Sequence, residues 1–255
     1  MRPARPNPGH SRQGPKPAQH GLARVISKRG TCSRSQAEVL VREGRVRVAG
    51  RLVRDPEAAT RIDAEIAIDG AEAEAAPRRY LVLNKPRGML TTASDEGGRA
   101  TVYTCLEGQD LPWLAPVGRL DKASEGLLLF SNDSEWAARI SSPESRLDKT
   151  YHVQIDRLAD ADLIARLRSG IEDRDEHLAA VAVRELRRGE KNSWLEIILD
   201  EGRNRQIRRL LAAFDISVLR LVRVAIGSLQ LGGLGKGQWR DLHGDEVRSL
   251  ASPSV

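Results

Sequence analysis

The sequence predicts an α+β protein with two domains. Residues 21–70 contain two short helical patterns followed by an alternating, basic hairpin pattern. After residue 78, short apolar runs typical of strands predominate, with brief helical patterns between them. An Ala/Glu-rich stretch up to Pro77 separates these regions, as expected of a linker. At 255 residues the chain can bury a core in each domain.

The composition argues against several classes of protein. No apolar run approaches the roughly 20 residues that a membrane span needs. The basic N-terminus lacks the apolar core of a secretory signal. Cys32 and Cys105 have no second cysteine or suitably spaced histidine nearby, so we expect reduced thiols and no metal site. The expected location is the cytoplasm.

Positive charge is concentrated at the front of the chain. Up to Glu57 there are 13 Lys and Arg against four Asp and Glu, whereas the remainder has 28 against 31. This surplus favours a polyanionic partner, most simply RNA, although a solubilising surface is the alternative. Residues 1–20 are rich in Pro, Arg, Gly and Gln without apolar periodicity, so we expect a disordered basic arm.

The first domain is predicted to be a module of two helices and a hairpin over residues 21–70. Apolar residues at helical spacing end at Gly30, and Ser33 with Gln36 offers a capping box for a second helix. Two valines then alternate with arginines before the chain turns at Ala49-Gly50.

The second domain is predicted over residues 78–245, after a short β pattern at 62–68. Its expected elements are strands at 80–84, 127–130, 149–155 and 194–199, helices at 102–106, 136–140, 160–170 and 207–214, two edge strands within 177–191, and a strand–turn–strand unit ending at 239–240.

The stretch from Val117 to Asp133 carries the clearest chemical signal. It places Asp121 on a loop between a Gly-Arg turn and an apolar strand, which can hold a reactive carboxylate in place. The tripeptide Arg-Leu-Asp alone says little, because residues 146–148 repeat it without a following strand. Only the flanking turn and strand favour chemistry over a surface ion pair.

Two other stretches carry candidate site residues. Alternation in 149–155 puts Tyr151 on the core-facing side, either as a structural residue or with its hydroxyl in a polar cleft. Four arginines crowd the start of the helix expected within 201–214. They oppose the helix dipole, which favours compensation by carboxylates, RNA phosphates or both over a merely solvated face.

The glycines between 227 and 237 do not form a nucleotide-binding loop. Lys236 is followed by Gly237 rather than Ser or Thr, and no helix opens there. The chain also lacks a Gly-rich cofactor loop of the kind that an RNA methyltransferase needs.

Four stretches in order resemble the ribosomal-RNA pseudouridine synthases of the RsuA type. They are VGRLDKASEGLLLFSND (117–133), KTYHVQI (149–155), EGRNRQIRRLLAAF (201–214) and the ending at 221–242. Residues 21–70 resemble an RNA-binding domain of the ribosomal-protein-S-four type. The resemblance implies a mixed, mainly antiparallel catalytic sheet that makes pseudouridine without cofactor or metal.

The resemblance also implies roles for individual residues. Asp121 would be the nucleophile that acts on the extruded uridine. Tyr151 would stack on the base and could transfer a proton. Arg208 would keep Asp121 ionised, with Arg205 as the alternative partner. Arg119 would help to hold the place or the phosphate of the extruded nucleotide.

The expected RNA-binding residues beyond the nucleophile's loop are all arginines, namely Arg29, Arg34, Arg42, Arg45, Arg47, Arg203 and Arg205. The expected substrate is a specific uridine of ribosomal RNA, with a lean toward the large subunit from the Ser193-Trp194-Leu195 segment. The alternative is a non-catalytic RNA-binding or ribosome-assembly factor. The expected partner is ribosomal RNA or an assembling subunit, and the expected state is a monomer.

Overall fold

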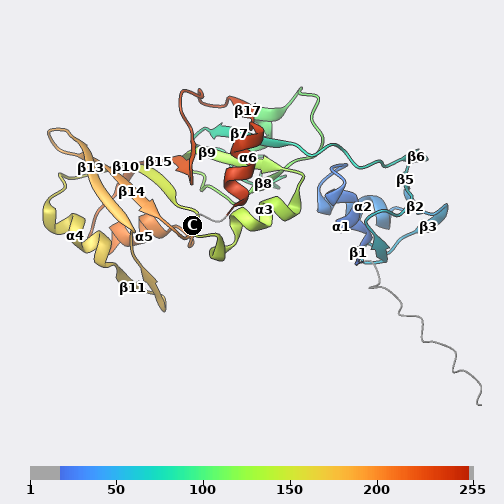
Figure 1. Ribbon diagram of the computed structural model, residues 1–255, viewed down its shortest axis with the longest axis horizontal. Coiled ribbons are helices and arrows are strands. Elements are labelled where there is room, and N and C mark those ends of the chain that lie inside the picture. Colours follow the sequence, from blue (N-terminus) through green and yellow to red (C-terminus); the bar gives the residue numbers. More distant parts are fainter. Residues whose placement is uncertain (1–17, 253–255) are drawn as a thin grey trace, which may run out of the picture. The chain divides into compact units, whose positions relative to one another are not determined.

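A computed structural model describes residues 18–252 (Figure 1). The chain divides into two compact units, with the boundary in the sequence between Ala75 and Ala76. The mixed helix and sheet composition of both units confirms the α+β class. Most of the predicted arm lies outside the described residues. Its last residues do not fit the prediction, because β1 (Gln19–Gly21) pairs with β4 (Ala59–Arg61).

The first unit contains the two predicted helices and the predicted hairpin. The helices are α1 (Leu22–Lys28) and α2 (Arg34–Arg42), and a second sheet has the order β3 (Arg51–Val53), β2 (Val46–Val48), β5 (Ile66–Ile68) and β6 (Ala71–Glu72). The capping box of α2 is confirmed, since Ser33 Oγ accepts from the Gln36 amide at 3.1 Å.

Two details of the first unit differ from the prediction. The β pattern at 62–68 is not one strand, because the chain turns between β4 and β5, which belong to different sheets. Arg29 is not part of an exposed basic face: it is 8% exposed, and its guanidinium donates to the carbonyls of Ile62, Ala64 and Ala73. It is a structural residue that ties α1 to the end of the module.

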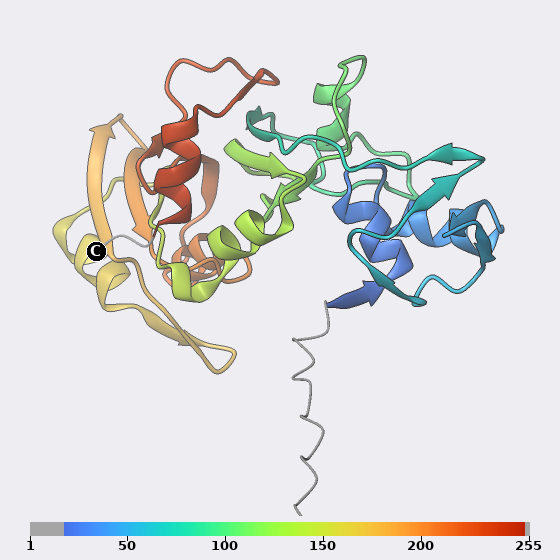
Figure 2. The ribbon, with the colours of Figure 1, turned by 45° about the vertical axis from the view of Figure 1, so that its right-hand side comes forward.

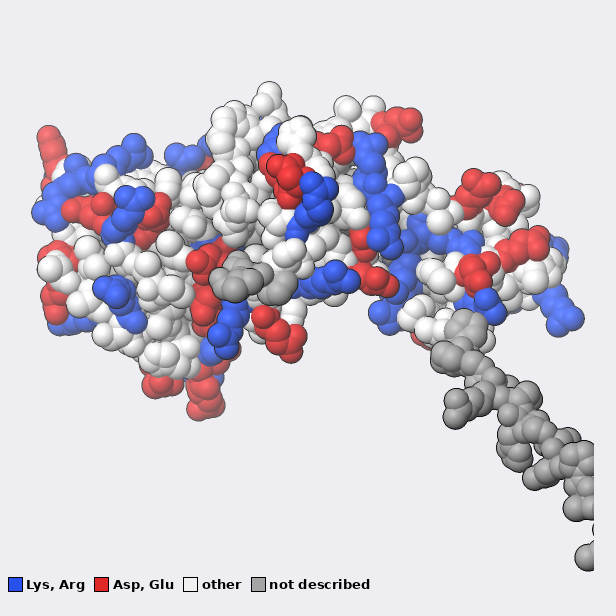
Figure 3. All heavy atoms as spheres, in the orientation of Figure 1, with Lys and Arg blue, Asp and Glu red and all other residues white. Residues whose placement is uncertain are grey.

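The other arginines of the expected basic face are exposed and mostly ion-paired. Arg34 pairs with Glu57 at 2.8 Å, Arg42 lies 3.4 Å from Glu38, and Arg45 pairs with Asp69 at 2.5 Å. Figure 3 accordingly shows blue and red side chains interleaved on the visible face of this unit. Exposed pairs contribute little stability, so RNA phosphates can replace these carboxylates at small cost.

The second unit is built on a nine-stranded sheet. Its central path runs β13 (Ala182–Arg188), β14 (Ser193–Leu199), β10 (Lys149–Ile155), β15 (Val218–Ile226), β9 (Glu125–Ser131), β7 (Tyr80–Lys85) and β17 (Trp239–Asp241). β8 (Ala115–Val117) pairs with β9 and β16 (Leu229–Gln230) with β15. The sheet is mixed and mainly antiparallel, as expected.

One parallel pair, β9 with β15, joins two halves of this sheet. The first half contains β7, β8, β9 and β17, and the second half contains β10, β13, β14, β15 and β16. Its register pairs Glu125 with Val222 and Gly126 with Arg223. The strands approach so closely that a Cβ on Gly126 would lie 2.2 Å from the Arg223 carbonyl oxygen, and Gly126 has φ +102°. Only glycine fits this position.

Helices cover opposite faces of the two halves. In the first half, α3 (Ser134–Ser141) and α6 (Gly244–Ala251) lie side by side (Figure 2) and bury Val82, Leu127 and Leu129. In the second half, α4 (Ala161–Ser169) and α5 (Gln206–Ala212) cover the face that includes Tyr151. Tyr151 is 9% exposed, which confirms the predicted alternation of β10.

Two local predictions need correction. Residues 177–191 are not two edge strands: β12 (Glu176–Leu178) pairs with β11 (Ile171–Asp173), and β13 continues to Arg188 and pairs with β14, with a register shift between Glu185 and Arg187. The short helix predicted at 102–106 is present as a 3-10 helix, and another 3-10 helix follows α3 at Pro143–Ser145. The domain continues past 245, because α6 was not predicted.

No helix within residues 18–252 is both long and apolar enough to cross a membrane.

Candidate active site

A cleft of about 480 Å³ lies in the second unit, where the two halves of the sheet meet. The three predicted catalytic residues, Asp121, Tyr151 and Arg208, all line it, although they come from segments far apart in sequence. Three predicted RNA-binding arginines, Arg119, Arg203 and Arg205, line it too. Its size suits a nucleotide-sized ligand. The remaining predicted RNA-binding residues belong to the first unit.

The loop that carries Asp121 is fixed by hydrogen bonds to its backbone. The Asp121 carbonyl accepts from the Ser124 amide at 2.9 Å, and the Leu120 carbonyl accepts from the Thr91 hydroxyl at 2.8 Å. Gly88 donates to the Lys122 carbonyl at 2.7 Å. The carboxylate itself keeps 36% of its surface exposed in the cleft. The arrangement therefore fixes the backbone of the loop and leaves the carboxylate accessible in the cleft.

Lys85 supports this loop from beneath and was not predicted as a site residue. It is fully buried, and its Nζ donates to the carbonyls of Pro86, Asp121 and Ser124 at 3.1, 3.2 and 2.9 Å. Burial lowers the pKa of Lys85 to about 8, against the opposing charge of Asp121. The sequence signal for a buried Lys85 was its position directly after the apolar strand 80–84, because a residue that continues a buried strand is expected to be buried as well.

Lys85 makes the stability of the protein depend on pH. Lys85 binds its proton less tightly in the folded protein than in the unfolded chain. The contribution of Lys85 to the free energy of unfolding therefore rises with pH between about 8 and 10.5. We expect Lys85→Met to be destabilised by about 2–4 kcal/mol at pH 7, because it leaves buried carbonyls without a donor. Denaturant titrations at pH 7, 8.5 and 10 should show that the wild type gains stability relative to Lys85→Met as pH rises. A constant difference would contradict the depressed pKa.

Arg205, rather than Arg208, makes the direct ion pair with Asp121. Arg205 Nη1 lies 3.3 Å from Asp121 Oδ2, and its side chain is 51% exposed. Arg208 instead donates from Nη2 to the Ala123 carbonyl at 3.2 Å, while its Nε is buried without an acceptor among the described residues. Burial lowers the pKa of Arg208, as does the charge of Arg205, whereas Asp121 opposes that shift. Both arginines therefore interact electrostatically with Asp121, Arg205 from an exposed position and Arg208 from a more buried one.

The two other arginines of this segment are compensated by carboxylates, one of the predicted outcomes. Arg209 pairs with Asp173 at 2.5 Å and Glu176 at 2.6 Å, and Arg203 pairs with Glu201 at 2.7 Å. α5 itself begins at Gln206, so Arg203 and Arg205 precede the helix. Fewer positive charges therefore oppose the helix dipole than the sequence predicted. Arg203 therefore has fewer donors free for RNA than expected.

Arg223 is a second site residue that the sequence reasoning missed. It lies beside Tyr151 in the register of β10 and β15, is 6% exposed and lines the cleft. Its Nε donates to the Leu127 carbonyl at 2.8 Å, but its Nη2 has no acceptor within residues 18–252. A buried donor without a partner is costly, so this Nη2 is available to a water molecule or to a ligand in the cleft. The sequence signal was its alternation with Leu221 and Ala225, which puts Arg223 on the buried side of the strand.

The geometry suits covalent chemistry on a bound nucleotide. A partly exposed carboxylate, a flat aromatic ring and several cations face one cleft. Within the described residues, no group of three or more His, Cys, Asp or Glu is placed to hold a metal ion.

Comparison with known proteins identifies the class. Residues 79–213 match the RNA pseudouridylate synthase family, and residues 21–59 match the S4 domain. The chain belongs to the RNA pseudouridylate synthase family, and its first unit carries an S4 domain.

Full-length relatives support this assignment. The chain is 34% identical to the ribosomal large subunit pseudouridine synthase B of Bacillus subtilis over 232 residues, which is 90% of this chain and 94% of that one. It is 38% identical to an uncharacterized RNA pseudouridine synthase of Aquifex aeolicus over 90% and 92% of the two chains. A crystal structure of a pseudouridylate synthase superposes with a TM-score of 0.63 at 28% identity, covering 91% of this chain and 99% of that one.

Proposed function

We propose that this protein converts a specific uridine of ribosomal RNA, in the large subunit, to pseudouridine. The observation that carries the proposal is that Asp121, Tyr151 and Arg208 line one cleft on a fixed loop, a strand and a helix. The relative from Bacillus subtilis, named for the large subunit, supports the choice of RNA.

In the proposed reaction the target uridine leaves its stack and enters the cleft. Extrusion costs a few kcal/mol, least in a loop or bulge. The Asp121 carboxylate acts covalently on the nucleotide, and the bond between ribose C1′ and uracil N1 breaks. The base turns and C5 bonds to the ribose C1′ as the bond to Asp121 breaks. The C5 proton leaves to water and N1 takes up a proton, so the product is an isomer of uridine.

Other residues orient the nucleotide and balance charge. Tyr151 stacks on the base. Arg208 and Arg205 offset the negative charge of Asp121, and Arg119 holds the place or the phosphate of the extruded nucleotide. The free Nη2 of Arg223 supplies a donor beside Tyr151.

A direct assay tests the proposal. Purified protein is incubated with unmodified transcripts of large-subunit and small-subunit ribosomal RNA, and pseudouridines are mapped by chemical modification. We expect one new pseudouridine, in the large-subunit transcript. No new pseudouridine in either transcript would favour the alternative, a non-catalytic RNA-binding or assembly factor. A product in the small-subunit transcript alone would overturn the choice of subunit.

The proposed division of labour between the units gives a further prediction. A chain starting at Ala76 keeps Asp121, Tyr151 and Arg208 but loses the basic front. We expect weaker RNA binding and a shallower dependence of log affinity on log salt, by roughly 0.7–0.9 per lost phosphate contact. The rate at saturating RNA should survive. Unchanged affinity and salt slope would show that the front unit is not the RNA-binding handle, and a lost saturated rate would place it in the active architecture.

A further inference from the structure

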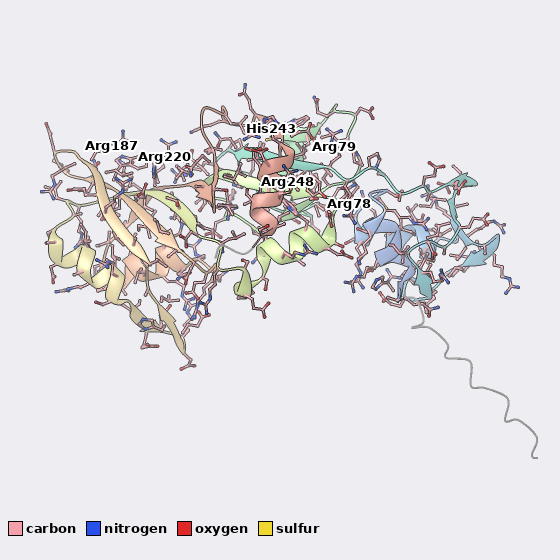
Figure 4. All side chains as sticks on the ribbon, in the orientation of Figure 1. Arg78, Arg79, Arg187, Arg220, His243 and Arg248 are labelled. Atoms are coloured by element: carbon pink, nitrogen blue, oxygen red, sulfur yellow. The ribbon has the colours of Figure 1, made fainter. Side chains whose placement is uncertain are left out.

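The second half of the catalytic sheet has one face that no described helix covers. α4 and α5 pack on the face that includes Tyr151, and the next residue along β10, His152, points to the other side. In Figure 1, α4 and α5 lie below this half of the sheet, and in Figure 4 the side chains of Arg187 and Arg220 stand above it. This bare face is therefore separated from the catalytic cleft by the thickness of the sheet.

A row of flat and cationic side chains crosses this bare face. The register places Arg187 of β13 beside Trp194 of β14, Trp194 beside Gln154 of β10, and Gln154 beside Arg220 of β15. The guanidinium of Arg187 lies 4.6 Å from the centre of the Trp194 ring, and that of Arg220 lies 5.8 Å from it. One aromatic ring is thus flanked by two cations.

Arg187, Trp194 and Arg220 of this row line a groove of about 350 Å³. The other lining side chains come from the same sheet, and they are His152, Leu186, Val222 and Val224. The groove is large enough for a flat ring, with an apolar floor and cations at its rim.

The two arginines differ in how they are held. Arg220 is fixed by Glu125, which it contacts at 2.7 and 2.9 Å and which also pairs with Lys236 at 2.9 Å. These cations lower the pKa of Glu125 to about 2, with Arg220 as the main cause. Arg187 is exposed and has no carboxylate partner among the described residues. Arg220 is therefore a rigid support, while the charge of Arg187 remains available to an anion.

We propose that this bare face is a second RNA-binding surface, which holds a single-stranded segment other than the one that carries the target uridine. One base stacks against the Trp194–Arg187 pair, and Arg187 neutralises an adjacent phosphate. Proteins that bind single-stranded RNA combine aromatic platforms on a sheet with cations in this way. The chain's membership of a family that acts on RNA and the uncompensated Arg187 favour RNA over a protein partner, for which the groove offers little apolar area.

The surface lies on the opposite face from Asp121, so its loss should weaken binding without slowing chemistry. We expect Trp194→Ala to raise the Kd of the full-length protein for a large-subunit rRNA transcript by about 5- to 100-fold. Arg187→Glu should weaken binding and reduce the salt slope by roughly 0.7 or more. The single-turnover rate at saturating RNA should stay at the wild-type value in both.

Matched controls separate this surface from general effects. Arg168→Glu changes the net charge as Arg187→Glu does, but on α4, on the covered side of the sheet, and it should leave affinity nearly unchanged. Trp194→Phe keeps a ring and should retain most of the affinity. If Trp194→Ala fails to fold by circular dichroism, the exposed Arg187→Glu variant still provides the test.

Ultraviolet crosslinking gives an independent measure. We expect RNA to crosslink to Trp194 itself after irradiation of the wild-type complex, and fragmentation of the tryptic peptide from Asn192 to Arg203 separates this crosslink from one at Arg203, which lines the cleft. The proposal is overturned if Arg187→Glu binds rRNA with wild-type affinity and salt slope, or if Arg168→Glu loses as much affinity. Such a result would favour a protein as the partner of the bare face. Binding is measured without turnover, so the outcome is independent of whether the transcript is converted.

Discussion

Asp121→Asn is expected to abolish pseudouridine formation while the protein stays folded and bound to RNA. The amide has almost the same shape, and the loop is held by backbone bonds to the Asp121 and Leu120 carbonyls that the substitution leaves in place. It lacks the charge that the proposed nucleophile needs. Loss of a nucleophile costs about 10⁴-fold or more in rate. Tritium release from RNA labelled at uracil C5 measures turnover directly.

The chain contains a matched control for this experiment. Arg146-Leu147-Asp148 repeats the tripeptide of the active loop, but Asp148 is exposed and does not line the cleft. Asp148→Asn should therefore release tritium at nearly the wild-type rate. Turnover by Asp121→Asn close to wild type would sink the assignment of the nucleophile. Equal loss in both variants would point to a general effect of charge.

The second large effect is expected at Arg208. Arg205 makes the direct ion pair with Asp121, but that pair is half-exposed and screened by water, so it contributes little. Arg208 is more deeply placed, and a charge acts more strongly where water is excluded. We expect Arg208→Met to lower the single-turnover rate by about 10²–10³-fold, with RNA affinity changed far less.

Arg205→Met is the comparison for this prediction. It should lower the rate by less than about tenfold and weaken binding, because an exposed cation at the mouth of the cleft also attracts phosphates. Rapid-quench measurements at saturating RNA separate rate from affinity. If Arg205→Met has the larger effect on rate, the direct ion pair seen in the structure is the one that matters for chemistry.

Much of the site followed from local sequence patterns. Alternation placed Tyr151 on the buried side of β10, and the turn and strand around Asp121 marked its loop. These signals are short in range, so they can be read from neighbouring residues. The grouping of Asp121, Tyr151 and Arg208 in one cleft followed instead from the resemblance to a known family.

Residues whose roles depend on distant partners could not be predicted in this way. Arg29 reads as a surface cation, yet three carbonyls 33 to 44 positions away converge on its guanidinium. Lys85 reads as part of a polar loop until its contacts with the Asp121 and Ser124 carbonyls, 36 and 39 positions away, are known. The sequence did not show whether Arg205 or Arg208 pairs with Asp121, because the answer depends on where α5 begins. The helix begins at Gln206, so Arg205 lies just before it and Arg208 lies within it.

The parallel pair between β9 and β15 has a consequence for how the enzyme is made. Glu125 and Gly126 leave the ribosome long before Val222 and Arg223, so the seam beneath the cleft stays open during most of synthesis. Such long-range parallel contacts form slowly, because a large loop must close first. β17 pairs with β7 later still. A nascent chain that already contains Asp121, Tyr151 and Arg208 is therefore expected to be inactive until β15 and β17 have been released and can pair with β9 and β7.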